Sequence, residues 1–153
     1  MTGSGTPATT RRLTIASLAY IALSLIGAVI AITQNLPAEP MGEGSGTGRP
    51  VLQEFLVGNG TAMSPGLPWL AFQAVLTLLI RRQDLWGRIS VVLLGFAALL
   101  TGIFATTEPI FRRTFSAATF DPAKALVEAG MVVIPLAIVL LAVIDFRRRL
   151  RGS

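Results

Sequence analysis

The stretch 13-LTIASLAYIALSLIGAVIAIT-33 decides the fold, because it holds 21 consecutive residues without a charge. A helix of that length is roughly 30 Å long, which matches the hydrocarbon core of a bilayer. Arg11 and Arg12 precede it, so a cleaved signal peptide is the alternative. The apolar part of a signal peptide usually has only about 7–15 residues. We therefore interpret residues 13–33 as a transmembrane helix.

Three further apolar runs follow, at residues 64–80, 89–107 and 125–144. The whole chain of 153 residues is 52% hydrophobic and 14% charged, with a mean hydropathy of +0.67. A soluble domain is typically about 25% charged, so this chain lacks the groups that would cover a water-facing surface. The sequence predicts an all-α integral membrane protein, a four-transmembrane-helix bundle within residues 13–146.

The connecting segments predict two short helices outside the spans. Residues 34–63 form a Pro- and Gly-rich outer loop, within which 51-VLQEFLV-57 predicts an amphipathic helix with Glu54 off its apolar face. Residues 109–119 predict an interfacial helix, since Phe111 and Phe115 are four positions apart and share a face.

The two chain ends are polar or basic. We expect residues 1–12 to form a disordered tail and residues 147–153 a basic tail, both cytoplasmic. With four spans, the tails and the link between the second and third spans share one side and carry nine basic residues. The opposite side carries four basic residues. The positive-inside rule thus places both termini in the cytoplasm of a multi-pass cell (plasma) membrane protein, and the Arg-, Ala- and Gly-rich composition is typical of a prokaryote.

Small and polar residues recur along the predicted spans and indicate where helices pack. Small residues allow the close backbone approach that holds helices together in lipid. We expect two seams of such residues and two inward polar side chains: Gly95, Ala98, Gly102 and Ala105; Ser17, Ser24, Ala28 and Ala31; and Gln73 and Thr101.

The chain has few groups that do chemistry. It contains no Cys and no His, which excludes disulfides, thiolate sites and the commonest general base. It also lacks nucleotide-binding motifs. We expect no catalytic residues, no cofactor, no metal and no nucleic-acid partner. Chemistry carried by carboxylates alone is the enzymatic alternative.

Glu128 is the residue that most needs an explanation, because it lies inside the last predicted span. It is seven residues past Asp121, the expected N-cap, and thus roughly 10 Å along the helix. One interpretation is a structural pair with Lys124, four residues earlier. The other is a ligand or partner site on the outer rim, suited to a cation, a proton or an amine. The candidate site consists of Glu128, Lys124, Glu108, Arg112, Arg113 and Asp121.

Two functions remain open at the level of sequence. The first is a non-enzymatic accessory or interaction subunit of a membrane complex, because reactive groups are few and small-residue seams are present. The alternative is a small transporter or channel that works as a dimer, with an outer carboxylate site at Glu128. The expected partners are the lipid bilayer and a membrane protein, or a second copy of the chain.

Overall fold

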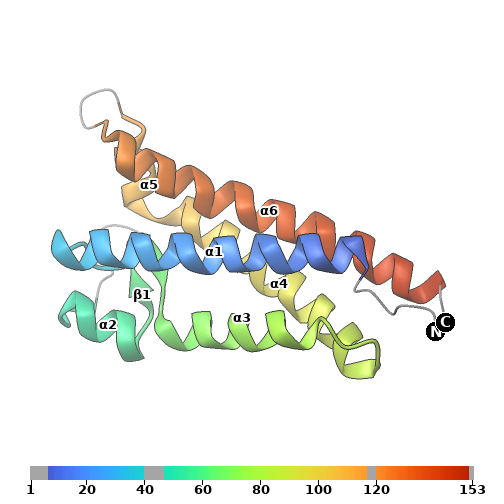
Figure 1. The fold of residues 1–153 in the computed structure, drawn as a ribbon. Coiled ribbons are helices and arrows are strands. Elements are labelled where there is room, and N and C mark those ends of the chain that lie inside the picture. The colour runs from blue at the N-terminus through green and yellow to red at the C-terminus, as the bar shows by residue number, and fades with distance from the viewer. Residues whose placement is uncertain (1–6, 40–46, 117–119, 152–153) are drawn as a thin grey trace.

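The computed structural model describes residues 7–39, 47–116 and 120–151, which form helices and one short hairpin (Figure 1). The elements in chain order are α1 (Ala8–Thr33), α2 (Val51–Val57), β1 (Gly60–Thr61), β2 (Ser64–Pro65), α3 (Leu67–Leu79), α4 (Leu85–Thr107), α5 (Pro109–Thr114) and α6 (Pro122–Arg151).

Three of these helices are long and apolar enough to cross a membrane, namely α1, α4 and α6. Helix α3 is equally apolar but has 13 residues, so it is only about 20 Å long. The structure therefore confirms an all-α protein with the helices of a membrane protein.

The four apolar helices pack in a ring. Helix α1 packs on α6, α6 on α4, α4 on α3 and α3 on α1. Each runs opposite in direction to its two neighbours (Figure 1). The start of α1 and the end of α6 therefore meet at one end of the ring, which we call the terminal end. The hairpin, α2 and α5 lie at the other end, which we call the loop end.

Small residues of α4 contact α6, and they belong to the seam that the sequence predicted for this span. A Cβ atom added to Gly95 would lie 3.0 Å from the Cβ of Ala142, and one added to Gly102 would lie 3.4 Å from the Cβ of Pro135. The contact at Gly95 is tight, so a larger side chain there would push α6 away, whereas the contact at Gly102 is an ordinary van der Waals distance. The predicted seam of α1 is also confirmed, since all four of its residues are buried: Ser17, Ser24, Ala28 and Ala31.

Both ends of the chain are more helical than the sequence suggested. Helix α1 begins at Ala8, so the expected disordered tail is wrong for residues 8–12, and α6 continues to Arg151. The reason is that Thr9 and Thr10 bind the carboxylate of Asp145, which fixes the two helix ends against each other. Residues 1–6 and 152–153 of the expected tails lie outside the described part of the chain.

The hairpin replaces the expected start of the second span. Strands β1 and β2 pair antiparallel, and Thr61 also bridges to Pro37 after α1. Gly60 has φ +106, a backbone conformation that favours glycine. Helix α3 therefore starts at Leu67, three residues later than expected, with Pro68 in its first turn.

Helices α2 and α5 also lie at the loop end, where α2 packs on β1 and α3, and α5 packs on α4 and α6. Glu54 of α2 is buried, whereas the sequence placed it off the buried face. Its carboxylate accepts hydrogen bonds from the Thr47 hydroxyl at 2.6 Å and from the Asn59 N–H at 3.1 Å, which explains why it turns inward. Helix α5 ends at Thr114, and residues 117–119 of the expected interfacial helix lie outside the described residues.

Candidate ligand-binding pocket

A pocket of about 470 Å³ opens at the loop end of the ring. It lies between α1, the first turn of α3, the last turns of α4, the second turn of α6 and the hairpin. The pocket exists because α3 is shorter than its neighbours, and the thin hairpin fills only part of the space above it. Its volume falls in the range of small-molecule sites, about 300–1,000 Å³.

Glu128 faces this pocket from α6 with only 1% of its surface exposed. Among the described residues, no hydrogen-bond donor reaches its Oε1 atom. A buried polar atom without a partner costs roughly 1–3 kcal/mol, and more when it is charged. Because Glu128 also lines the pocket, a bound group that reached this oxygen would be stabilising.

Glu108 is the second carboxylate of the pocket and is also buried. It follows the last residue of α4, and its Oε2 atom accepts a hydrogen bond from the Glu39 N–H at 3.0 Å. It lies near enough to Glu128 for their charges to repel. Burial, together with the nearby charge of Glu39, raises the pKa of Glu108 to about 7, so its charge changes near neutral pH.

Two aromatic residues add further unpartnered polar atoms to the lining. The Tyr20 side chain is fully buried, and its hydroxyl lies near Ser24 and Thr101 without a hydrogen bond of ordinary geometry to either. The indole N–H of Trp69 is likewise buried without a partner in the described structure. Phe104, Met63 and Met131 supply apolar wall. The pocket thus combines a carboxylate pair with aromatic and apolar surfaces.

The structure brings together only part of the candidate site that the sequence predicted. Glu128 and Glu108 share the pocket, whereas Lys124 lies 3.7 Å from the carboxylate of Asp121 rather than pairing with Glu128. Asp121 also caps α6 by accepting the Ala123 N–H. The two arginines of α5, Arg112 and Arg113, are exposed and do not line the pocket.

Sequence reasoning missed Tyr20 and Trp69 as pocket residues. Tyr20 is the single tyrosine of the chain and lies in the middle of an apolar span, where a hydroxyl needs a partner. That position was a usable signal. Trp69 resembles an ordinary aromatic-belt residue, and nothing in the sequence distinguishes it.

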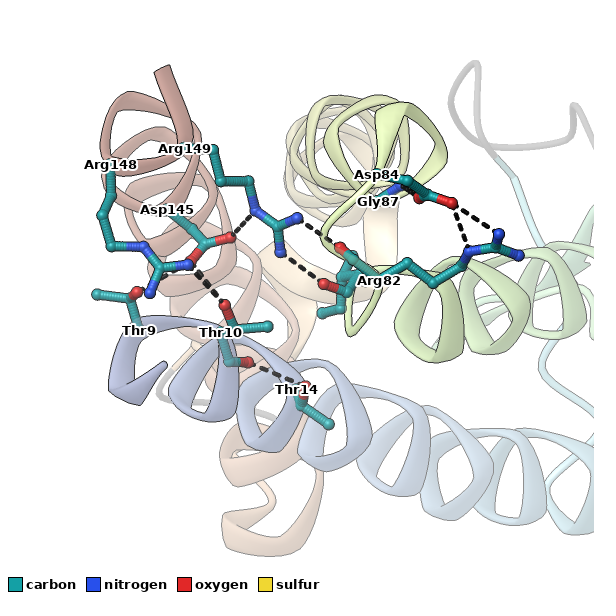
Figure 2. A network of polar contacts seen from close by, with 10 residues as sticks. Thr9, Thr10, Thr14, Arg82, Asp84, Gly87, Asp145, Arg148 and Arg149 are labelled. Carbon is teal, nitrogen blue, oxygen red and sulfur yellow. Dashed lines mark hydrogen bonds and ion pairs between the residues drawn. The ribbon is translucent and has the colours of Figure 1, made fainter. Parts of the chain in front are cut away.

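A second buried polar cluster closes the terminal end (Figure 2). Asp145 is fully buried, and its carboxylate accepts hydrogen bonds from Thr9 at 2.9 Å, Thr10 at 2.8 Å and the Arg149 Nε at 2.6 Å. Arg148 pairs with the same carboxylate at 3.0 Å. Its acceptor capacity is filled, in contrast to that of Glu128.

Arg149 connects this cluster to α3. Its guanidinium donates to the carbonyls of Ile80 and Arg82, which follow the last turn of α3 (Figure 2). Helix C-termini leave carbonyls without partners, so Arg149 caps α3 while it pairs with Asp145. The sequence signal was an acid four residues before a base, the favoured order on a helix. We interpret the cluster as structural.

The geometry limits the chemistry of the pocket. No group of three or more His, Cys, Asp or Glu side chains that could hold a metal occurs in the described ranges. Comparisons with protein-family models, curated proteins and solved structures found no match for this chain. Inference about function therefore rests on the pocket itself.

Proposed function

We propose that the chain crosses a cell membrane four times, with α3 as a short fourth crossing and both termini in the cytoplasm. The alternating helix directions of the ring support an even number of crossings. The excess of basic residues at the terminal end supports the orientation. Arg81 and Arg82 directly follow α3, and their long side chains can extend a short helix to the head groups.

Single cysteines test this topology directly, because the natural chain has none. Gln53→Cys lies on an exposed position of α2, and Arg151→Cys on an exposed position at the end of α6. In intact cells, a membrane-impermeant maleimide should label Gln53→Cys and should label Arg151→Cys only after permeabilisation. The cysteine-free parent is the blank. Labelling of both positions from one side would contradict four crossings.

We further propose that the protein is non-enzymatic and binds a small ligand in the loop-end pocket, as an accessory or interaction subunit of a membrane complex. The unpartnered carboxylate oxygen of Glu128 is the observation that carries this proposal. The cost of leaving it unpaired is offset when a ligand supplies the missing partner. Tyr20 and Trp69 offer the same ligand further polar contacts.

Binding is favoured over transport because the ring is filled below the pocket. Gln73, Ser17 and Thr77 are buried there, and the Ser17 and Thr77 hydroxyls are 2.6 Å apart. The Asp145–Arg149 pair then closes the terminal end. A transporter or channel, the alternative, would have to break this pair or form its path between two copies. Flux through liposomes that contain the protein would favour the alternative.

The fluorescence of Trp69 alone can report ligand binding. Replacing Trp86 by Phe leaves Trp69 as the only tryptophan, and Trp86 is exposed and outside the pocket. In lipid nanodiscs, we expect at least one of three small probes to change the Trp69 emission saturably. The probes are neutral neopentylbenzene, cationic benzyltrimethylammonium and anionic 4-tert-butylbenzoate.

Two alanine variants separate the pocket from the lipid. Ala105 lines the pocket, so Ala105→Phe should fill it and abolish the saturable change. Ala22 is exposed on α1, so Ala22→Phe should leave the change intact. If no probe gives a saturable response, or if Ala105→Phe responds like its control, the proposed binding function is wrong.

A further inference from the structure

We infer that the pocket selects an organic ammonium cation that carries an apolar group. The inference rests on the proposed binding function and names the chemical class of its ligand. Three features of the pocket support it: the sign of its charge, the aromatic part of its wall, and the shortage of the oxygen ligands that a metal ion would need. Each is independent of the others.

The charge of the lining is acidic without compensation. Two carboxylates, Glu108 and Glu128, face the pocket, and none of the described residues that line it is basic. Lys124, the single lysine of the chain, lies against Asp121 instead. A cation would interact favourably with both carboxylates in a site of low dielectric, whereas an anion would be repelled.

The remainder of the wall suits an alkylated cation. Tyr20, Trp69 and Phe104 all line the pocket, and aromatic faces attract ammonium groups, which is how quaternary ammonium ligands are recognised. Met63 and Met131 provide soft apolar contacts for the rest of the ligand.

A bare metal ion or a proton fits the same site poorly. Calcium takes about 6–8 oxygen ligands, and the described residues offer no cluster of three acidic side chains. A proton on Glu128 would leave a pocket of about 470 Å³ and its aromatic wall without an occupant. An organic cation accounts for both the charge and the volume.

A ligand with one positive charge faces two carboxylates, and protonation of Glu108 can match the charge of the pocket to that of the ligand. Its raised pKa of about 7 means that it holds a proton below neutrality and is ionised above it. A quaternary ammonium has no proton of its own, so its affinity should rise between pH 6 and pH 8 as Glu108 ionises. The other titratable groups around Glu108 are Glu39, Glu128 and Tyr20, while the hairpin and the first turn of α3 contribute none to the lining.

The test compares benzyltrimethylammonium with neopentylbenzene, which has the same shape without the charge. In the Trp86→Phe protein, the cation should bind about tenfold or more tightly than the neutral probe, because the Coulomb attraction between opposite charges a few Å apart in a protein exceeds that factor. Anionic 4-tert-butylbenzoate should bind most weakly. The advantage of the cation should grow from pH 6 to pH 8.

Substitutions of the two glutamates test whether their carboxylates cause the preference for the cation. Glu128→Gln should remove most of the cation's advantage and leave neopentylbenzene binding unchanged. Glu108→Gln should reduce the pH dependence, and the double variant Glu108→Gln, Glu128→Gln should abolish what remains, because the two carboxylates interact. Asp84→Asn is the matched control, because Asp84 caps α4 at the far end of the ring, and asparagine also caps well.

The outcomes distinguish the inference from the binding function beneath it. If the neutral probe binds as tightly as the cation, or if Glu128→Gln retains the cation's advantage, the ammonium inference is wrong and a ligand pocket remains. If only the anionic probe binds, the ammonium inference is likewise wrong, and if none of the three probes binds, both proposals fail. Should Glu128→Gln fail to fold, the comparison of cation with neutral probe in the parent protein still decides.

Discussion

Replacing Asp145 by Asn should lower the free energy of unfolding by about 3–5 kcal/mol, the usual effect of removing one partner of a buried ion pair. Asp145 is fully buried, and Arg149, whose side chain is 3% exposed, would lose the charge of the carboxylate that its guanidinium contacts at 2.6 Å. Thr9 and Thr10 would also lose a charged acceptor. The start of α1 and the end of α3 should therefore loosen together.

Reversible unfolding in mixed micelles, followed by tryptophan fluorescence, measures this effect. The control is Asp84→Asn, because the Arg82–Asp84 pair is about half exposed and exposed ion pairs contribute little to stability. The double variant Asp145→Asn, Arg149→Met removes the buried guanidinium as well and should recover part of the stability. A single variant as stable as the parent would show that the cluster does not hold the terminal end together.

The helices could be predicted from the sequence because each one needs only local information. An uncharged run such as residues 13–33 is sufficient to locate a membrane helix, and Asp121 followed by Pro122 correctly marked the start of α6. The α4–α6 seam was also legible, since Gly95 and Gly102 lie on one face. These features depend on spacing along one helix.

The site was only partly predictable because it depends on contacts between distant segments. Glu128 was identified as anomalous, but Lys124, four residues away, suggested a local pair that the fold does not make. Lys124 lies partly exposed beside Asp121, whereas Glu128 turns into the ring toward Glu108. Helical spacing predicts which residues share a face of a helix, but it does not predict which face turns inward.

The hairpin was hidden for the same reason. Residues 60–63 read as the end of the outer loop and residues 64–65 as the start of a span, and only tertiary packing makes them a wall of the pocket. The sequence does carry a trace of this packing in α1, where Gly27 interrupts a run of larger residues. A Cβ atom added to Gly27 would lie 2.3 Å from the carbonyl oxygen of Met63. The glycine is what allows the hairpin to approach α1.

Gly27→Ala should therefore destabilise the protein by about 1–3 kcal/mol, as overpacking usually does. Alanine favours a helix over glycine by about 1 kcal/mol, so a loss of stability would have to come from the clash. The obstructing atom belongs to the backbone and cannot rotate away, so the hairpin must move. Because Met63 also lines the pocket, we expect the Trp69 response to the probes to weaken in the same variant.

Gly130→Ala is the matched control, since it makes the same substitution in a helix of the same ring. Its added Cβ would also lie 2.3 Å from a neighbour, but that neighbour is the Leu23 Cδ2 atom, at the end of a flexible side chain. Leu23 can change rotamer, so the variant should be as stable as the parent or slightly more stable. Unfolding midpoints and probe titrations of the two variants, measured side by side, test the argument. If Gly27→Ala behaved like Gly130→Ala in both measurements, the hairpin would not be seated on α1, and the pocket would lose the wall that gives it its shape.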